Sequence, residues 1–359
     1  MWSREPGARL ASDRGLDGGK LQSPAIVRLP SGGWRLFYVG VGPDRPFPEC
    51  QGCILSAGSE NGVDFTKDEG IRLAPVPGRP HMSRRLIAPT ITPVEGGWRM
   101  YMEARGPADE LTAIASAFSS DPDALEWEFE AGLRLTHPTM GFGGPRYTPL
   151  PGGGGRLFLF ASVYTEEGPS VRPQPPSSIP PSSFTPLPAQ GERLSQGVYS
   201  ATTADGLAFT LDPGVRVAGD QPLTTTDGRQ YPAFGVTAAE VLPPTAPGSP
   251  WTMYFSAWED APPGSVVPKH PSADAAFDAA ETPSDDFAAA SIASDMAGFR
   301  SRIYVTTSDD PEGLSWNCAD AECVIEGEGY GGAGGDAVHA EDMSVAVLED
   351  GSERDRHRL

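Results

Sequence analysis

The sequence predicts an all-β fold, a five-bladed β-propeller that forms one domain over residues 1–359. Three observations support this prediction. A unit of two strand pairs recurs along the chain, half units stand at both chain ends, and 43 Gly and 38 Pro residues supply many turns. Short runs rich in Val, Ile, Phe, Tyr and Trp between Gly, Pro and Asp clusters are typical of strands joined by turns. A unit that recurs in a constant order indicates a repeat fold.

The first half of each unit predicts a β-hairpin. An apolar strand is followed by a tight, often Gly-rich turn and a second strand that carries aromatic residues, as in SPAIVRLPSGGWRLFYVG. The copies are Ser23–Gly40, Ala88–Ala104, Gly144–Ala161 and, less regularly, Tyr231–Ala257. Glycine adopts the positive φ that tight hairpin turns require, so each copy should place the first and second strands of a blade side by side.

The second half of each unit predicts the third and fourth strands. An apolar strand leads into a turn of small polar residues, and Phe or Trp then opens another strand. The copies are Ile54–Leu73, Ile114–Leu135, Val198–Val217 and Ile303–Ile325. In the first three copies a Gly follows five residues after the aromatic residue. We expect the aromatic side chain to pack against the neighbouring blade.

The two chain ends predict how the ring closes. Trp2–Gly7 has the spacing of the second half unit, and Gly7–Leu10 matches Gly70–Leu73. Residues 340–359 resemble a first strand, a turn and the start of a second strand. The N-terminal strand should therefore seal a fifth blade, which lacks an evident third strand, and closure would remove two exposed sheet edges. An open array or a β-sandwich is the alternative, and the constant order of the units argues against both.

Two insertions interrupt the period, at about residues 165–196 and 259–299. The first is dominated by Pro and Ser, and the second is acidic and rich in Ala and Pro. Both fall between the second and third strands of their blades, so they should emerge on the same face. We interpret them as low-complexity loop expansions.

Charge and composition limit the classes of molecule that are expected to bind this protein. The formal net charge is −21, whereas a phosphate-binding surface needs a basic stripe, so neither nucleic acid nor an anionic membrane is expected as a partner. No apolar run approaches the roughly 20 residues of a membrane helix. No signal peptide is visible at the N-terminus. The sequence determines neither the cellular compartment nor the oligomeric state.

The hairpins SPAIVRLPSGGWRLFYVG and APTITPVEGGWRMYMEA, with the turns SENGVDF and TADGLAF, resemble the five-bladed propeller glycosidases of the arabinanase, levansucrase and invertase type. The resemblance implies a carbohydrate substrate at one mouth of the central channel, where the innermost strands start. It also implies hydrolysis of a glycosidic bond by two Asp or Glu side chains on either side of that bond. No phosphate loop or dinucleotide fingerprint is present, and no cofactor is expected.

The sequence departs from this resemblance at the positions that should carry the acids. In the resembling enzymes the carboxylates often precede a Pro at the start of an innermost strand. The matching residues here are Ser23, Ala88, Gly144 and Tyr231, and none is acidic. Two hypotheses therefore remain open. One is a glycosidase whose acids have moved, and the other is a propeller that binds a carbohydrate or a protein without catalysis.

Three residues are the predicted catalytic acids: Glu341, Glu103 and Asp342. Glu341 and Asp342 open the innermost strand of blade five after a Gly-rich loop that contains His339. Glu103 ends the second strand of blade two, where an acid among apolar residues needs a partner or a purpose. Arg105 could be that partner, which would make the pair structural. Each acid could also be an ordinary solvated carboxylate.

Basic and aromatic residues near the same mouth are the predicted substrate-binding residues, since Arg offers bidentate donors to sugars. They are Arg84, Arg85, Arg105, Arg146, Tyr231, Trp258 and His339. Glu259 and Asp260 are further acids at the equivalent place in blade four. The alternative for the arginines is that they bridge blades through backbone carbonyls.

The cysteines and histidines do not predict a metal site. Cys50 and Cys53 lie on a loop, and Cys318 and Cys323 flank a strand in a blade that is not a sequence neighbour. The second spacing is loose for zinc, and the chain has only 5 His residues. Cys50 and Cys53 could form a local disulfide in an oxidising compartment or remain thiols.

Overall fold

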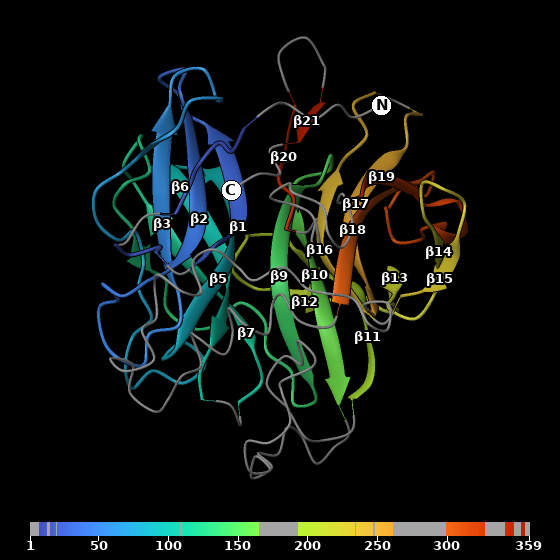
Figure 1. Cartoon of the computed structure of the whole chain (residues 1–359), viewed down its shortest axis with the longest axis horizontal. Coiled ribbons are helices and arrows are strands. Elements are labelled where there is room, and N and C mark those ends of the chain that lie inside the picture. The colour runs from blue at the N-terminus through green and yellow to red at the C-terminus, as the bar shows by residue number, and fades with distance from the viewer. Residues whose placement is uncertain are drawn as a thin grey trace.

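The structure is a computed structural model, and it describes residues 7–12, 15–18, 20–107, 110–164, 193–233, 235–246, 248–260, 299–326, 342–347 and 353–355. The described residues form an all-β propeller with one short helical turn, η1 (Cys318–Asp320). The antiparallel sheets follow one another in chain order, from the blue sheet of β1–β4 to the yellow and orange strands of β16–β19 (Figure 1). The predicted all-β propeller is confirmed.

Four sheets have four or more strands, and we call them blades one to four in chain order. Blade one holds β1 (Lys20–Arg28), β2 (Trp34–Val41), β3 (Cys53–Ser59) and β4 (Thr66–Lys67). Blade two holds β5 (Arg85–Val94), β6 (Gly97–Arg105), β7 (Ala113–Ser119) and β8 (Glu128–Phe129). Blade three holds β9 (Met140–Pro149), β10 (Gly155–Tyr164), β11 (Arg193–Thr203), β12 (Thr210–Leu211) and β13 (Val217–Ala218). Blade four holds β16 (Gly235–Leu242), β17 (Trp251–Asp260), β18 (Phe299–Ser308) and β19 (Glu322–Glu326).

Two short ribbons complete the described strands. One pairs β14 (Pro222–Thr224) with β15 (Gln230–Pro232), and the other pairs β20 (Val345–Val347) with β21 (Glu353–Asp355). The described residues thus form four complete blades and not the five that the sequence predicts. The predicted N-terminal strand falls mostly on residues 1–6, which lie outside the described part of the chain. Of the C-terminal residues that the sequence assigns to a fifth blade, the described part of the chain contains only the β20–β21 ribbon and residues 342–344.

The innermost strands are in contact around one axis. β5 lies against β1 and β9, and β9 lies against β16. β20 contacts β1, and the backbone N–H of Val345 in β20 donates to Glu240 of β16. The segment of β20 therefore lies between blades four and one, where Figure 1 draws it.

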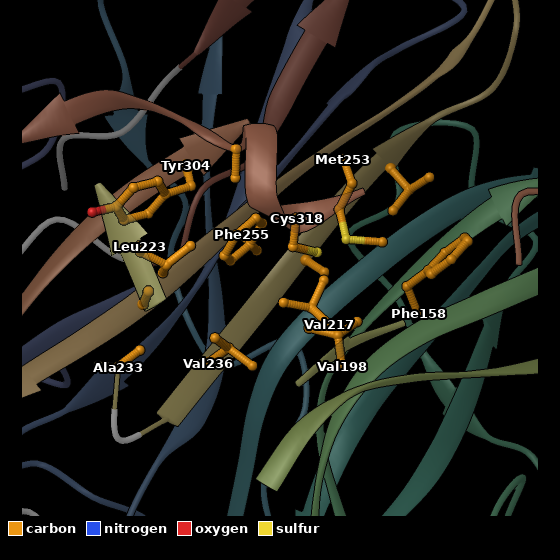
Figure 2. Packing of buried hydrophobic residues seen from close by; sticks show 14 of the residues in the cluster. Phe158, Val198, Val217, Leu223, Ala233, Val236, Met253, Phe255, Tyr304 and Cys318 are labelled. Carbon is orange, nitrogen blue, oxygen red and sulfur yellow. The ribbon is translucent and has the colours of Figure 1, made fainter. Parts of the chain in front are cut away.

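The hydrophobic core is divided among the spaces between blades, as propeller packing requires. Figure 2 shows the cluster between blades three and four, where Phe158 and Val198 meet Met253 and Phe255. In the second, third and fourth of these half units, the predicted aromatic residue reaches the preceding blade. Trp127 meets Phe37, Phe209 meets Tyr101 and Trp316 meets Phe158, each edge-on at centroid distances of 5.8, 5.5 and 6.3 Å. This part of the repeat prediction is confirmed.

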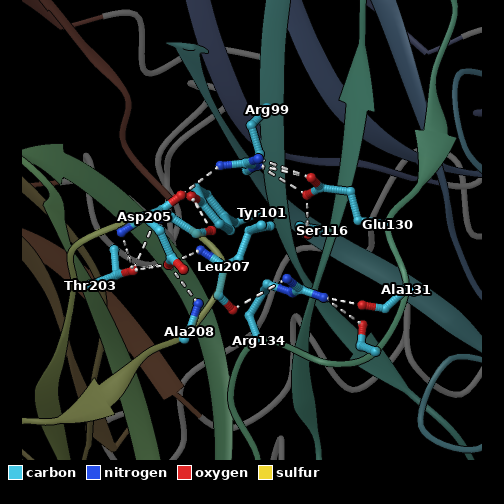
Figure 3. Close-up of polar contacts among 12 residues, drawn as sticks. Arg99, Tyr101, Ser116, Glu130, Ala131, Arg134, Thr203, Asp205, Leu207 and Ala208 are labelled. Atoms are coloured by element: carbon cyan, nitrogen blue, oxygen red, sulfur yellow. Dashed lines mark hydrogen bonds and ion pairs between the residues drawn. The ribbon is translucent and has the colours of Figure 1, made fainter. Parts of the chain in front are cut away.

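A recurring arginine links each of the first three blades to the next one. It stands two residues after the glycine of the second half unit, and its Nη1 donates to a turn carbonyl of the following blade. The pairs are Arg72 with Leu125, Arg134 with Leu207 and Arg216 with Leu314. Figure 3 shows the second of these links beside the bonds of Arg99 to Glu130 and to the Asp205 carbonyl. The links give a donor to turn carbonyls that strand pairing leaves unused.

Blade four corrects one sequence prediction. Its innermost strand begins at Gly235, so Tyr231 does not start that strand but belongs to the β14–β15 ribbon. The sequence reading missed the ribbon because its Asp227-Gly228 turn joins strands of only three residues each. The predicted insertions coincide largely with residues 165–192 and 261–298, outside the described residues, while residues 193–196 and 259–260 lie in strands.

Candidate functional site

An irregular residue lies near the start of several innermost strands, at the end where the sequence predicts the mouth of the channel. The pairing register breaks between Gln22 and Ala25 in β1 and between Ile87 and Thr90 in β5, and a similar break occurs in β9. Four residues there have left-handed backbone angles: Ser23 (φ 55°), Ala88 (φ 51°), Gly144 (φ 53°) and Asp342 (φ 57°). We call these four residues the mouth ring. Such angles are costly for residues other than Gly, and they gather at functional sites.

Asp342 is the acid of this mouth ring among the described residues. It directly precedes Met343, as Ser23, Ala88 and Gly144 directly precede a proline. Its half-buried carboxylate accepts a hydrogen bond of 2.6 Å from the Ser23 hydroxyl. The geometry therefore gives the segment that leads into β20 an acid at the position that Ser23, Ala88 and Gly144 occupy in β1, β5 and β9.

Glu103 brings a second carboxylate to the same ring. It lies opposite Ile87 near the end of β6 and is almost fully buried. One carboxylate oxygen accepts from Arg105 Nε, and the other accepts from the Gly144 backbone N–H at 3.1 Å. A Cβ atom on Gly143 would clash with this carboxylate. Because Gly143 and Gly144 have no side chains, the carboxylate of Glu103 can lie against the backbone of blade three at this position of the ring.

Arg85 lies in the electrostatic field of both acids. It starts β5, pairs with Arg105 in the strand register and is buried. Burial and, to a lesser extent, the charge of nearby Arg105 lower the pKa of its guanidinium to about 9, whereas the charges of Glu103 and Asp342 oppose the shift. Arg85 Nε has no hydrogen-bond partner. A buried donor without a partner near two carboxylates is suited to a polar ligand. Arg84 is half-buried beside it.

Arg146 does not line a binding site, because it is a buried clamp on the axis. Nη1 donates to the Pro89 carbonyl at 3.2 Å, and Nη2 donates to the carbonyls of Pro24 at 3.4 Å and Met343 at 3.3 Å. Nε lies 3.4 Å from a carboxylate oxygen of Glu240. One side chain of blade three therefore touches the innermost segments of blades one, two and four and the segment that leads into β20. The sequence left two hypotheses for this arginine, sugar binding and bridging of blades through backbone carbonyls, and these contacts support the second.

Glu240 was missed by the sequence reading. It occupies the place in β16 that Arg146 occupies in β9, after the corresponding register break. Burial raises the pKa of this carboxyl to about 7, although Arg146 and the Val345 N–H favour its ionised form. In the sequence it is one acid among 48 Asp and Glu residues, so nothing singled it out.

We expect Glu240 to make stability depend on pH. In the unfolded chain its pKa returns to 4.5, so between 4.5 and about 7 the folded state holds a proton that the unfolded chain has lost. The contribution of Glu240 is therefore fully present below about pH 4.5 and is lost as the pH rises through about 7. The thermal unfolding midpoint of the wild type relative to Glu240→Gln should fall from pH 5 to pH 8. Parallel midpoints across that range would contradict the assignment.

The blade-four residues form a network of ion pairs with one another and with Arg229. Glu259 pairs with Arg302 and, at 2.6 Å, with Arg229, and Arg302 also holds Glu326 at 2.8 Å. Tyr231 is buried beneath both arginines and lies 3.0 Å from the hydroxyl of Tyr304.

These contacts anchor the β14–β15 ribbon to blade four. The prediction that Tyr231 starts the innermost strand of blade four is therefore wrong, and Glu259 is held by two arginines. Trp258 is 6% exposed in β17, opposite Gly235. So little of its ring is accessible that it forms no open platform for a sugar.

Two predicted residues, Glu341 and His339, lie outside the described residues. A His–Glu pair that the sequence reading missed lies at the same end of blade two. His81 has a left-handed φ of 61°, its backbone N–H donates to Glu110 at 2.7 Å, and its ring nitrogen lies 3.0 Å from the Leu111 carbonyl. The loops that carry this pair precede β5 and follow β6, next to Arg84 directly before β5 and Arg105 at the last position of β6.

Within the described residues, no cluster of three or more His, Cys, Asp or Glu side chains could hold a metal ion. The same residues contain no helix with the length and apolar character needed to cross a membrane.

Comparison with known proteins gives fold neighbours only in solved structures. No protein-family model and no curated protein matches the chain. A solved glycoside hydrolase matches with a TM-score of 0.56 at 13% identity, covering 98% of this chain and 90% of its own. An endo-arabinase from Bacteroides thetaiotaomicron matches with a TM-score of 0.54 at 10% identity, covering 96% and 92%.

An α-L-arabinofuranosidase from Lactobacillus brevis matches with a TM-score of 0.51 at 12% identity, covering 93% of this chain and 81% of its own. At such identities the likeness concerns the fold, because fold does not imply function. The predicted resemblance is confirmed at this level, and the chain has the all-β propeller fold of these glycoside hydrolases.

Proposed function

We propose that the ring has five blades and that the N-terminal segment completes the fifth. Gly7 has a φ of 81°, which matches 80° at Gly70 and 82° at Gly214. Leu10 is buried against Leu36 and Leu55 of blade one, as Leu73 is buried against blade two. The position of β20 between β16 and β1 supports the same closure, because it supplies an innermost strand for the fifth blade.

We further propose that the protein binds a carbohydrate at the mouth ring and hydrolyses a glycosidic bond there, with Asp342 and Glu103 as the acids. The observation that carries the proposal is that Asp342 belongs to the mouth ring and Glu103 bonds to another member of it, Gly144. Glu103 belongs to blade two, and Asp342 belongs to the segment of the proposed fifth blade. In a ring of five, blades two and five are not neighbours, so we expect these carboxylates to approach the axis from separate sides. A bond between them could be attacked from one side and protonated from the other.

The contacts of the two carboxylates suit different roles. Glu103 is buried and held by Arg105 and the Gly144 backbone N–H, so it fits the role of a fixed stabilising or nucleophilic carboxylate. Asp342 is half-buried and accepts a hydrogen bond from the Ser23 hydroxyl, so it is the more accessible of the two and fits the role of the general acid. Arg85, buried beside both, would orient the substrate through its unpartnered Nε. Glu341, next to Asp342 in the sequence, remains a candidate for the same chemistry.

A second candidate is carbohydrate binding without hydrolysis. It is favoured by the absence of acids at Ser23, Ala88 and Gly144, and by the enclosure of Glu103 in contacts that would have to rearrange before it touched a substrate. The proposal and this alternative share the ligand and the mouth but differ in whether a bond is broken.

The test separates binding from hydrolysis. The purified full chain would be offered aryl α-L-arabinofuranosides and linear arabino-oligosaccharides, which the names of the fold neighbours suggest as first substrates. Binding is measured by calorimetry, and hydrolysis by release of the aryl group or of reducing ends. We expect both binding and release in the wild type and in Glu95→Gln, which changes an exposed acid at the far end of the same hairpin as Glu103.

Binding without release in the wild type would instead establish the second candidate. Absence of both across a wider panel of furanosides and pyranosides would contradict the carbohydrate proposal altogether.

A further inference from the structure

The loop before β3 brings two thiols into contact. Cys50 and Cys53 lie with their Sγ atoms 3.3 Å apart, and both residues are buried, at 1% and 3% exposure. The loop approaches solvent at once, because Pro48 and Glu49 directly before Cys50 are exposed. Two thiols in contact on a short loop close to solvent need little movement to join.

We propose that Cys50 and Cys53 are a redox modification site that forms a reversible disulfide at the edge of the mouth. With hydrogen peroxide as oxidant, the Cys50 thiolate attacks one peroxide oxygen, and the other oxygen leaves as hydroxide. Cys50 is thereby oxidised to a sulfenic acid. The Cys53 sulfur then attacks the Cys50 sulfur, and water leaves with the thiol proton. A dithiol reductant reverses the reaction by thiol–disulfide exchange.

The surroundings of the two cysteines favour different roles for them in this reaction. The hydrogen bond from Cys53, the Gly52 backbone and the charges of Arg45 and Arg85 lower the pKa of Cys50 in spite of its burial. The same thiol contact and burial raise the pKa of Cys53. Since the thiolate is the reactive form, Cys50 is the attacking thiol and Cys53 the resolving one.

The pair is connected to the mouth through the two residues between the cysteines. The Gln51 N–H donates to the Arg84 carbonyl at 2.8 Å, and the Leu86 N–H donates to the Gly52 carbonyl at 3.2 Å. These two bonds bracket Arg85, whose side chain also lies against Gly52. A disulfide would close a small ring around Gln51 and Gly52 and hold this strip against β5. The consequence for ligand binding rests on the proposed role of Arg85, whereas the disulfide itself does not.

Cys318 and Cys323 provide an internal control in the same molecule. Cys318 is buried in η1, and burial raises the pKa of its thiol. Cys323 is half-buried in β19, with its Sγ 3.9 Å from the Ile325 carbonyl. The causes that shift the pKa of Cys318 include no arginine, so Cys318 should react more slowly than Cys50.

The experiment treats the folded full chain with hydrogen peroxide, alkylates the remaining thiols and digests with trypsin. Cys50 and Cys53 share the tryptic peptide from Leu36 to Lys67, because Arg45 is followed by proline. We expect the mass of this peptide to fall by two hydrogen atoms and its cysteines to resist alkylation. This oxidation should be about tenfold faster than the loss of the free Cys318 thiol. Dithiothreitol should restore both thiols. Cys53→Ser should leave a sulfenic acid on Cys50 that dimedone traps, and Cys50→Ser should leave Cys53 reduced.

A second readout tests the link to Arg85. Hydrogen exchange of the Leu86 amide should be roughly tenfold slower in the oxidised protein, because the ring restrains the opening of its bond to Gly52. Alkylation of both thiols after peroxide treatment, or equal loss of Cys318, would overturn the proposal. Both readouts are independent of glycoside turnover, so a failed hydrolysis assay leaves this test intact.

Discussion

Replacement of Asp342 by asparagine is expected to lower glycoside hydrolysis by about 10²–10⁴-fold, the usual contribution of a positioned acid or base. The amide oxygen can still accept the hydrogen bond from the Ser23 hydroxyl, so the local geometry should persist while the charge and the exchangeable proton are lost. Sugar affinity measured by calorimetry should change much less than turnover. The measurement is kcat and KM on an aryl glycoside.

Asp309→Asn is the matched control for this variant, because it makes the same chemical change at an exposed turn of blade four. It should retain wild-type kinetics. Full turnover in Asp342→Asn, with an unchanged unfolding midpoint, would remove Asp342 from the mechanism. Attention would then move to Glu341, where the equivalent Glu341→Gln variant separates the two neighbouring acids.

Replacement of Arg146 by methionine should lower the free energy of unfolding by about 3–5 kcal/mol, as for removal of one partner of a buried ion pair. The apolar stem of methionine can fill part of the space. However, the carbonyls of Pro24, Pro89 and Met343 lose their donor, and Glu240 loses its cation. Urea unfolding followed by tryptophan fluorescence measures the loss.

Two comparisons make the Arg146 prediction specific. Arg146→Lys keeps the charge but cannot reach several carbonyls at once, so its stability should lie between the wild type and Arg146→Met. The double variant Arg146→Met with Glu240→Gln should regain part of the loss, because no carboxylate is then left without its cation. Wild-type stability of Arg146→Met would show that the axis does not depend on this clamp.

The repeat made the fold predictable from sequence. Each half unit carries its own local signals, such as the turn glycines and the aromatic residue that opens the outer strand, and these signals act over a few residues. Contacts such as Trp127 with Phe37 then follow from the regular order of the blades. Blade four was misread at Tyr231 because the β14–β15 ribbon carries the same local signals as a blade hairpin.

The candidate site was predictable only in part. The pre-proline positions at Ser23, Ala88 and Gly144 are confirmed as members of the mouth ring, because the proline marks them in the sequence. Asp342 precedes Met343 instead, and its membership rests on its backbone angle and its bond to Ser23. Glu240 and His81 have no local signal, since their partners come from segments that are distant in the sequence.

By itself, the sequence determined the strand order, the turns and the packing surface of each blade, because these depend on residues that are close together along the chain. The tertiary structure decided which polar side chains meet at the axis. Glu103 reaches the backbone of Gly144, and Arg146 joins carbonyls from blades one and two and from the segment that leads into β20. Such contacts depend on how separate blades close around a common axis, and no short stretch of sequence encodes that closure.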